Sequence, residues 1–584
     1  MIKLLKCYKL KEWLLVLLSF TLIACQVWLE LKIPDFMQEI TVLVETNVSE
    51  MKDILINGGY MLLCALGSLF LTVLVGYIVA YLSSIFSYRV RKMIFEHTEK
   101  FSLEEIKKFK TSSLITRTTN DVTQLEMFLG MGLQLLIKSP LTAIWAIIKI
   151  LNKNSEWSIV TALAVVLLLI TIGIITAVVV PRFKIIQKLT DNVNNLIREN
   201  LTGIRVVRAF NAEKYQENKF NDTNKKLTKE QLFNQKTFAL LQPIMFMVMN
   251  VLALLIYFIG ALLIKNAALP DKLSLFADMI VFSSYAMQVI MSFLLLAFVF
   301  VMYPRAAVSA KRINEVLDTN ISIKSGNRKG IQDQGTIVFK DVSFKYPDAE
   351  ECILSDINFE VKKGETVAFI GSTGSGKSTL INLIPRFYDV TKGEILVDGV
   401  NVKEYDLEEL YNKIGYISQK AVIFDGTVSS NVNFGKSKKK ITKKDVEEAI
   451  KLAEAEEFVL KMDDKYDEHI ASSGSNISGG QKQRISIARA LAKKAEIYIF
   501  DYSFSALDYK TDAKLRKNLK ENMKESSVLI VAQRIGTIMN ADKIIVLNEG
   551  KMVGIGTHKE LLKTCEVYKQ IATSQLSEEE LKNV

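Results

Sequence analysis

Long apolar segments without charged residues alternate with charged segments through the first half of the chain. Five of them are near or beyond the roughly 20 residues that an α-helix needs to cross a bilayer. A sixth is interrupted only by Lys138 and Lys149. The pattern therefore predicts six membrane-spanning helices, at Trp13–Leu29, Gly58–Tyr88, Met127–Leu151, Trp157–Pro181, Thr237–Ile264 and Met279–Pro304.

Two long polar segments, Arg89–Glu126 and Arg182–Lys236, follow the second and the fourth span. At 1.5 Å per residue, paired helical arms of about twenty residues each would extend roughly 30 Å beyond the membrane. Arg182–Lys236 carries twelve Lys and Arg residues, whereas Asp35–Asp53 holds five acids and only Lys52. Because cytoplasmic loops collect basic residues, we expect the arms and both termini in the cytoplasm.

The positive net charge does not indicate that the chain binds a nucleic acid. The chain has 74 Lys and Arg against 63 Asp and Glu, a net charge of +11. The basic residues gather in the predicted cytoplasmic loops, so the expected partner is the lipid bilayer and no nucleic acid. The low proline count (8) and abundant lysine are compatible with a bacterial source, and a multi-pass protein of the plasma membrane is expected.

A chain of 584 residues is too long for a single hydrophobic core, and the pattern of apolar and polar segments divides it into several domains. Met1–Glu12 alternates Lys3, Lys6 and Lys9 with apolar residues, which predicts a short amphipathic helix at the inner membrane face. Residues 13–320 form the predicted membrane domain. Ile321–Gln334 is polar and contains two glycines, which is typical of a linker, and residues 335–584 form a second domain.

Short apolar segments separated by helical stretches follow the linker. Buried strands of a parallel sheet have this appearance, so the second domain is predicted to be α/β. The expected strands are Thr336–Phe339, Thr366–Ile370, Ile414–Ile417, Ile497–Phe500, Val528–Ala532 and Lys543–Leu547. The fold class is thus a six-helix transmembrane domain followed by an α/β domain.

A phosphate-binding loop lies between a strand and a helix of this domain. It fits G-x-x-x-x-G-K-[ST] and reads Gly371, Ser372, Thr373, Gly374, Ser375, Gly376, Lys377, Ser378, Thr379. The glycines let backbone N–H groups converge on one anion. Lys377 can pair with the terminal phosphates and Ser378 can hold Mg²⁺, so the chain is expected to bind a nucleoside triphosphate.

Further candidate residues surround this loop. Asp501 ends a buried strand, where an acid can bind the water shell of Mg²⁺. Gln419 follows another strand and is a candidate contact to the metal or its water. Tyr346 can stack on an adenine ring or pack in the core. A second anion site is predicted at the helix start formed by Ser478, Gly479, Gly480 and Gln481.

Six motifs occur in the order that is typical of the ATP-binding cassette family, and nearly the whole chain resembles an exporter half-transporter. They are the aromatic loop at Tyr346, the phosphate loop Gly371–Thr379, Gln419, the signature Ile477–Gln481, the Walker B Asp501 and the D-loop Ser505, Ala506, Leu507, Asp508. Phe101–Val122 and Glu199–Phe210 resemble the family's two cytoplasmic loops.

The resemblance implies that two cassettes close head to tail, with each ATP and its Mg²⁺ between one phosphate loop and the other signature. A second half-transporter is therefore expected as a partner. The implied ATP-binding set is Tyr346, Gly371–Thr379, Gln419, Asp501 and Gln533, with Ser378, Gln419 and Asp501 toward Mg²⁺, partly through water.

Two catalytic positions depart from the family pattern. Tyr502 stands where the family has a glutamate that activates water, and a phenol with a pKa near 10 is a poor base. Gln533 replaces the switch histidine and cannot carry a charge. The signature is intact. The hypothesis is a heterodimer with a degenerate ATP site in this chain and a working site completed by a partner that has the glutamate and the histidine. A homodimer with feeble turnover is the alternative.

The cargo is less well defined by the sequence. The flexible side chains of Ile244–Met249 can line a tolerant cavity or pack between spans. Lys138 and Lys149 can serve cargo or gating, or snorkel to the interface. Ser472 stands where exporters often have a glutamate that touches the membrane arms, which predicts weaker coupling there.

Three functions stay open. ATP-driven export of hydrophobic or amphipathic compounds, as in heterodimeric multidrug exporters, is favoured. The alternatives are a transporter of a peptide, lipid, haem or siderophore, or a nucleotide-gated channel or sensor that hydrolyses little ATP.

Overall fold

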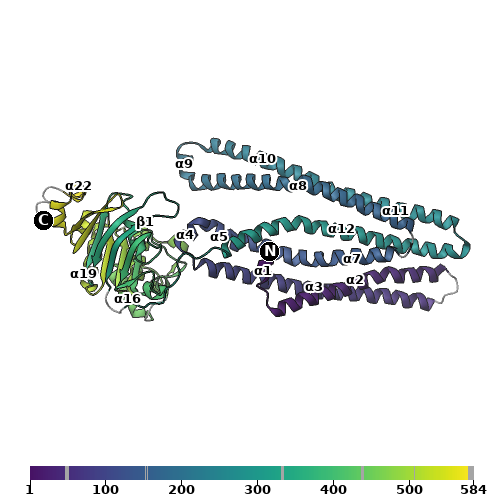
Figure 1. Cartoon of the computed structure of the whole chain (residues 1–584), viewed down its shortest axis with the longest axis horizontal. Coiled ribbons are helices and arrows are strands. Elements are labelled where there is room, and N and C mark those ends of the chain that lie inside the picture. The colour runs from purple at the N-terminus through teal and green to yellow at the C-terminus, as the bar shows by residue number, and fades with distance from the viewer. Residues whose placement is uncertain are drawn as a thin grey trace. The chain divides into compact units, whose positions relative to one another are not determined.

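The computed structural model describes residues 1–45, 51–151, 153, 155–330, 335–435, 440–505 and 507–576 (Figure 1). The chain packs as two units. The first comprises Met1–Glu99 and Thr111–Thr319, and the second comprises Lys100–Lys110 and Asn320–Val584.

Unit 1 is helical throughout its described part. Its elements are α1 Ile2–Leu5, α2 Leu10–Glu45, α3 Met51–Thr98, α5 Thr111–Thr118, α6 Asn120–Met127, the π-helix η1 Phe128–Gly132, α7 Leu133–Leu151, α8 Ser155–Thr202, α9 Ile204–Ala209, α10 Glu213–Ala239, α11 Leu241–Asn266 and α12 Leu269–Leu317. In these residues six segments are long and apolar enough to cross a membrane, which confirms the six predicted spans.

The long helices bury one side and expose the other. Trp157 and Tyr285 lie at the centre of the unit 1 core, whereas apolar side chains such as Leu63 and Leu163 are exposed. An apolar exterior suits contact with lipid. Pro34 and Pro304 lie inside helices, a position that neighbouring helices make tolerable in a membrane bundle.

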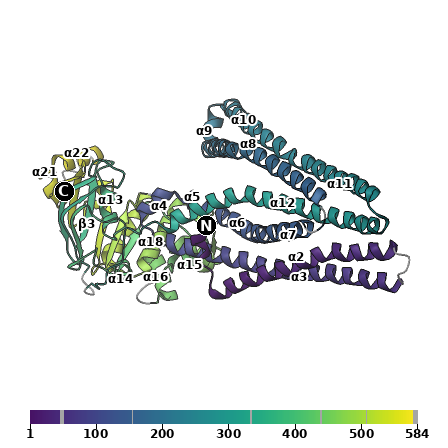
Figure 2. The same ribbon diagram turned by 45° about the vertical axis from the view of Figure 1, so that its right-hand side comes forward.

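The second long polar segment forms an arm of two helices. α8 continues beyond its apolar part to Thr202, α9 makes the turn, and α10 returns alongside α8 (Figure 2). Arg182 and Glu230 join the two helices through an ion pair of 2.7 Å. The N-terminus differs from the prediction, because Met1–Glu12 is not one helix: the four-residue α1 is followed by a turn and α2 begins at Leu10.

Unit 2 contains two main sheets. The strands are β1 Ile337–Phe344, β2 Leu354–Val361, β3 Thr366–Gly371, β4 Lys392–Val397, β5 Val400–Asn401, β6 Ile414–Ile417, β7 Gly426–Thr427, β8 His469–Ile470, β9 Ile497–Asp501, β10 Ser527–Val531, β11 Lys543–Asn548 and β12 Lys551–Gly556. The antiparallel sheet has the order β2-β1-β4-β5, and the six-stranded sheet has the order β12-β11-β3-β10-β9-β6.

Helices pack on these sheets. They are α4 Leu103–Phe109, α13 Lys377–Leu383, α14 Leu407–Lys413, α15 Val428–Val432, α16 Lys443–Leu452, α17 Glu456–Leu460, α18 Gly479–Ala492, α19 Tyr509–Asn522, α20 Ile535–Ile538, α21 His558–Thr564 and α22 Glu566–Gln575, with short 3₁₀ turns η2 Lys465–Asp467 and η3 Ser472–Gly474. Apolar clusters lie on both faces of the larger sheet.

The larger sheet sets the position of the candidate site. β11, β3, β10, β9 and β6 are mutually parallel, with Ile370 opposite Val546 and Phe500 opposite Ile417. Strands that are buried on both faces have continuous apolar sequences, which explains why these strands could be predicted. Since they run in parallel, the loops after β3, β6, β9 and β10 leave the same edge.

A short part of the first cytoplasmic loop belongs to unit 2. Ser102 caps α4, and Glu105 accepts a hydrogen bond of 3.1 Å from the Ser322 amide. The predicted linker packs on the cassette, because the Gly326 amide donates to the Tyr405 carbonyl at 2.7 Å. Residues 331–334 of that linker lie outside the described residues.

Candidate nucleotide site

The phosphate loop joins the central strand β3 to α13. Gly374 and Gly376 have φ angles of 86° and 91°, a left-handed conformation that costs little only for glycine. A Cβ at Gly376 would also lie 2.7 Å from Leu354, and one at Gly371 would lie 2.0 Å from the Leu547 carbonyl oxygen. The loop curls tightly against its neighbours, so its backbone N–H groups are gathered around one space.

Lys377 closes the loop from within. Its ammonium group donates to the carbonyls of Gly371 at 2.9 Å and Ser372 at 2.6 Å, and to the Ser375 hydroxyl at 3.1 Å. Burial lowers the pKa of Lys377. No carboxylate of the described residues neutralises this lysine in the structure, and terminal phosphates would supply the missing negative charge.

Oxygen donors suited to Mg²⁺ meet at the carboxyl end of β9. The Ser378 hydroxyl donates to Asp501 Oδ1 at 2.9 Å. Asp501 is almost fully buried, and this burial raises the pKa of its carboxyl group, while the bond from Ser378 acts in the opposite direction. A hydroxyl and a carboxylate side by side match the preference of Mg²⁺ for oxygen ligands, so the donor set fits the ion.

Tyr346 lies beside the phosphate loop. Its hydroxyl is 3.1 Å from Thr379 Oγ1, and its ring contacts Phe344 and Tyr388 edge to face. The Lys107 ammonium lies 4.7 Å from the centre of the Tyr346 ring. Lys107 comes from α4, a segment about 240 positions away in sequence. Nothing in the sequence signals this contact, since a lysine on a polar helix is ordinarily solvated.

Gln419 and Gln533 emerge from the same sheet edge as Asp501. Gln419 follows β6 and is exposed, and Gln533 follows β10 and is also exposed. The Gln533 carbonyl accepts a hydrogen bond of 2.8 Å from the Gln575 side chain. That bond fixes the backbone of Gln533, while its own amide group stays accessible at the edge where the phosphate loop opens.

Tyr502 follows Asp501 and turns away from β9 with a φ of 50°, an uncommon conformation for a bulky residue. Its ring is partly buried against the core of the antiparallel sheet. Burial, with a smaller contribution from the Asp501 charge, raises the pKa of Tyr502 to about 12. At neutral pH this position therefore presents a phenol that keeps its proton.

The signature segment forms the N-terminal end of α18. Ser478 and Gln481 form a reciprocal capping box, with the Gln481 amide 3.3 Å from the Ser478 hydroxyl and the Ser478 amide 2.8 Å from the Gln481 side chain. Gly479 has open space where a Cβ would point. The start of this 14-residue helix is exposed, so its first N–H groups are available to an anion.

The D-loop leads from Tyr502 into α19. The Ser505 hydroxyl donates to the Tyr502 carbonyl at 2.8 Å, and Asp508 caps α19 by accepting from the Thr511 amide at 3.0 Å. The hydrogen bonds from Thr511 lower the pKa of Asp508. Leu507 is buried, and Ala506 lies outside the described residues. Ser472 is exposed in η3.

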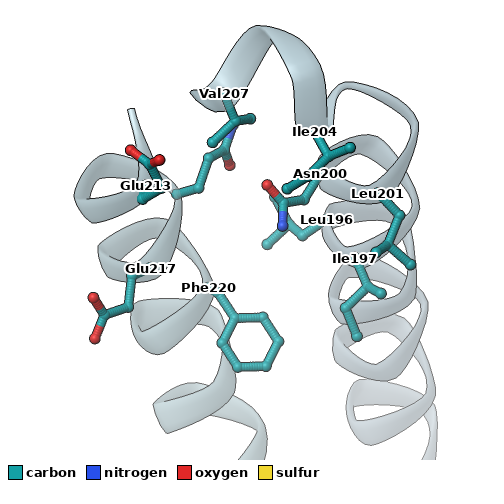
Figure 3. Close-up of a pocket in the computed structure, with 10 residues that line it drawn as sticks. Leu196, Ile197, Asn200, Leu201, Ile204, Val207, Glu213, Glu217 and Phe220 are labelled. Atoms are coloured by element: carbon teal, nitrogen blue, oxygen red, sulfur yellow. The ribbon is translucent and has the colours of Figure 1, made fainter. Parts of the chain in front are cut away.

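Unit 1 carries a groove at the tip of the arm. It has a volume of about 350 Å³ and lies between the end of α8, α9 and the start of α10. Figure 3 shows Leu196, Asn200 and Phe220 lining the space between the two long helices. Nearby, Val206 and Phe210 are 60% and 77% exposed. An apolar, exposed tip of this kind is typical of a contact surface.

A larger cavity lies between the spans of unit 1. Its volume is about 680 Å³, and its walls come from α8, α10, α11 and α12. Met245, Phe246 and Met249 of the methionine-rich segment face it, whereas Val248 packs in the helical core. The segment Ile244–Met249 therefore both lines a cavity and packs between spans, the two roles that the sequence left open.

Comparisons with known proteins agree with this architecture. A family model described as "ABC transporter transmembrane region" matches residues 13–318, and one described as "ABC transporter" matches residues 354–505.

Relatives match along most of their length. An ABC transporter ATP-binding protein of Mycobacterium bovis is 36% identical over 521 residues, which cover 88% of this chain and 87% of the relative. One of Bacillus subtilis is 34% identical over 500 residues, 86% of each chain. An ATP-dependent lipid A-core flippase of Vibrio vulnificus is 30% identical over 496 residues, 84% and 83% of the two chains.

A solved bacterial Atm1-family ABC exporter with ATP bound has a TM-score of 0.81 to this chain, covering 97% of this chain and 98% of the exporter at 23% identity. That likeness shows the fold. A six-span helical domain followed by a phosphate-loop cassette defines an ATP-driven membrane transporter. The chain belongs to the ABC transporter family and has the architecture of an exporter half-transporter, with one membrane region and one cassette.

Proposed function

We propose that this chain is the degenerate-site subunit of a heterodimeric exporter that moves hydrophobic or amphipathic compounds out of the cytoplasm. ATP and Mg²⁺ are held at its own phosphate loop, and hydrolysis takes place at the site that its signature completes on the partner. The proposal is carried by the partly buried phenol of Tyr502 beside Asp501, because burial raises its pKa to about 12.

A general base must accept a proton near the operating pH. Tyr502, with its pKa raised to about 12, cannot do so at neutral pH, and Gln533 offers an uncharged amide where the family has a histidine. The residues for binding are nonetheless in place: the loop glycines, Lys377, Ser378 and Asp501. Retention of ATP without efficient turnover follows from this combination.

The signature supports the second part of the proposal. Ser478 is held by its capping box at an exposed helix start, and Gly479 leaves the approach to the backbone open. An anion that is not bound by this chain's own phosphate loop can dock there. The partner's nucleotide, with a glutamate and a histidine on the partner's side, has the required charge.

Exposed apolar surface also supports a second half-transporter. The arm tip exposes Leu201, Val206 and Phe210, and the cassette separately exposes Val422 and the stacked pair of Phe424 and Phe434. Exposed aromatic clusters outside the membrane are costly unless another protein surface covers them. Both termini and the cassette lie in the cytoplasm in this proposal, because the basic arms do.

The membrane cavity indicates the cargo. Its lining is mainly apolar, with Met245, Met249, Met291, Phe238, Phe246 and Phe298 among the wall residues. Methionine side chains adapt to different shapes, and a cavity of about 680 Å³ accommodates a drug-sized molecule. Gln242 and Thr176 supply isolated polar contacts. A hydrophobic or amphipathic compound fits this chemistry best.

A lipid is the second candidate cargo. The apolar walls would suit acyl chains, and the lipid A-core flippase of Vibrio vulnificus is a relative of 30% identity. Discrimination between the two classes rests on which compounds stimulate the ATPase.

The experiment is an ATPase assay of the chain alone and of the co-purified pair in nanodiscs. We expect little turnover from the chain alone, brisk turnover from the pair, and stimulation by apolar drugs. Phe246→Lys should reduce stimulation at least tenfold while Tyr257→Lys, an exposed position on the same helix α11 outside the cavity lining, should not. Brisk turnover by the lone chain would contradict the proposal.

A further inference from the structure

Oppositely charged side chains of three helices meet in pairs within unit 1. The lysines come from α7 and the turn that follows it, and the acids come from α2 and α12. The nitrogen–oxygen distances are 2.8 Å for Lys138–Glu30, 2.7 Å for Lys149–Asp35 and 2.6 Å for Lys153–Asp278. The two charges that interrupt the third predicted span are therefore paired.

Each acid also accepts hydrogen bonds from neutral groups. Glu30 receives bonds from Gln26 at 2.9 Å and from Ser68 at 3.1 Å. Asp35 receives one from the hydroxyl of Tyr285, whose own burial is complete. These bonds help to orient the two carboxylates toward α7. Lys32, one turn before Asp35 on α2, is a second cation near Asp35, at 3.5 Å.

The third pair is reinforced in the same way. Asp278 accepts from the Gln38 side-chain amide nitrogen at 2.7 Å, and the Gln38 side-chain oxygen Oε1 accepts from Lys153 at 2.8 Å. Lys153, Gln38 and Asp278 thus form a closed triangle that joins the turn after α7 to α2 and α12. The side chains of the three ion pairs are 15% to 33% exposed.

Two of the three pairs, Lys149–Asp35 and Lys153–Asp278, lie toward one end of the bundle, whereas Lys138–Glu30 lies more than ten residues from the same ends of α7 and α2. α7 ends at Leu151 and α8 begins at Ser155, so Lys149 and Lys153 lie where a short connection joins two spans. Asp278 lies within ten residues of the start of α12, and Asp35 within ten of the end of α2. The opposite ends of α3 and α8 instead continue into the long polar arms.

Paired charges are suited to a contact that must open. Closed, each charge is compensated in surroundings of low polarity, where a lone charge is costly. When the helices part, water can solvate both charges, so the free-energy difference between paired and separated states is small compared with that of apolar packing. Such a contact is either paired or separated and has no stable intermediate state.

We propose that Glu30, Asp35, Lys138, Lys149, Lys153 and Asp278 form an ion-pair latch that holds α7 against α2 and α12, and that this latch opens when the short-connection end of the membrane domain opens during transport. The inference rests on the transport function but not on the identity of the cargo.

Charge reversal tests the latch in the co-purified transporter in nanodiscs. The five native cysteines are replaced, and Ile150, buried on α7 next to Lys149, is changed to cysteine as a reporter. Its labelling by a membrane-impermeant maleimide measures opening. Glu30→Lys and Lys138→Glu should each raise the nucleotide-free labelling rate at least fivefold. The double reversal should return it to within twofold of the parent.

Milder variants cover the case in which a reversal prevents folding. Lys138→Met leaves Glu30 unpaired and should raise labelling, whereas Lys138→Arg keeps the pair and should not. Reversal at Lys214 and Glu217, an exposed pair on the arm helix α10 with a distance of 3.2 Å, is the control and should change nothing.

Equal labelling in the parent and in the single variants, or a double reversal that labels as fast as either single, would overturn the latch. So would variants that change only cargo-stimulated ATPase with labelling unaltered, because the pairs would then serve the cargo. If apolar compounds fail to stimulate the parent, the proposed cargo is wrong while the labelling result still decides the latch.

Discussion

Asp501 and Tyr502 are adjacent in sequence, yet their side chains lie in different surroundings. Asp501 continues β9 and meets Ser378 at the mouth of the phosphate loop, whereas Tyr502 leaves the strand with a positive φ and packs its ring into the core. Binding of a metal–nucleotide complex needs the first residue. Activation of water needs a base at the second, and the phenol is not one.

Restoring both missing groups should create activity at this chain's own site. Tyr502→Glu combined with Gln533→His supplies a carboxylate base and a switch imidazole. A general base contributes about 10²–10⁴-fold to a rate, so we expect a rise of at least about 100-fold in phosphate release. The assay uses a partner whose own catalytic glutamate is replaced, so that only this site can turn over. Tyr502→Gln with Gln533→His is the matched control and should stay at background.

Asp501 should make Mg²⁺-dependent ATP binding sensitive to acid. Burial raises the pKa of Asp501, and only the ionised carboxylate attracts the metal. Binding measured by calorimetry should therefore weaken as the pH falls through this raised pKa, at a higher pH than for an ordinary aspartate. Asp501→Asn should abolish the Mg²⁺ dependence at every pH, and an unchanged dependence would contradict the assignment.

The raised pKa of Asp501 also predicts how this residue affects the stability of the fold at different pH. Since the folded-state pKa of Asp501 lies above its unfolded value, its contribution to stability is present at low pH and is lost as the pH rises through the folded pKa. Asp501→Asn removes the buried charge, so at neutral pH its free energy of unfolding should equal or exceed that of the parent. A lower thermal midpoint at neutral pH would show that the carboxylate stabilises the fold.

At the scale of elements, the N-terminus of α18 combines a helix cap with the proposed contact to the partner's nucleotide. The Ser478 capping box starts the helix and also presents the hydroxyl that the partner's nucleotide would meet. α16 begins with an equivalent capping box at Thr442. The two helices therefore allow the cap and the nucleotide contact to be separated.

Ser478→Ala and Thr442→Ala should cost similar stability, about 1 kcal/mol each, because each loses an N-terminal cap. Only Ser478→Ala should lower the ATPase rate of the pair, by at least about tenfold, while ATP binding by this chain stays unchanged. Thermal melts and steady-state turnover provide the two measurements. Equal turnover in both variants would remove Ser478 from the partner's site.

The elements that sequence could predict share one property: their apolar residues are continuous. β3, β6, β9, β10 and β11, the first part of β1 and the six spans were expected from such runs. β2 was not, because its second half alternates buried and exposed residues and it lies in an antiparallel sheet. A period-two pattern at Ile357, Phe359 and Val361 was the signal that could have found it.

Contacts between segments that are distant in the chain could not be predicted from the sequence. Arg89–Glu126 was expected to form paired helical arms of about twenty residues each. In the structure Lys110 takes a φ of 60° and ends the short helix α4, which belongs to unit 2 with the cassette. Lys107 thereby reaches Tyr346, and Lys138 reaches Glu30. Motif spacing predicted which residues gather around the phosphate loop, whereas these partners depend on tertiary packing.

At the scale of the whole molecule, a single chain holds one phosphate loop and one signature, and the proposed roles of these two belong to different nucleotides. The chain would bind one ATP with its own glycines and Lys377 and complete the hydrolysis of another through Ser478. In the proposed function, the asymmetry between the halves of the transporter follows from Tyr502 and Gln533 alone, without any change in the fold of the cassette.

The most direct test identifies the nucleotide at each site after turnover. The pair is incubated with a photoreactive ATP analogue labelled on the α-phosphate, crosslinked, and separated into its two chains. Each chain's nucleotide is bound mainly by its own phosphate loop, so we predict uncleaved triphosphate on this chain and diphosphate on the partner. Diphosphate on this chain, in proportion equal to that on the partner, would contradict the account.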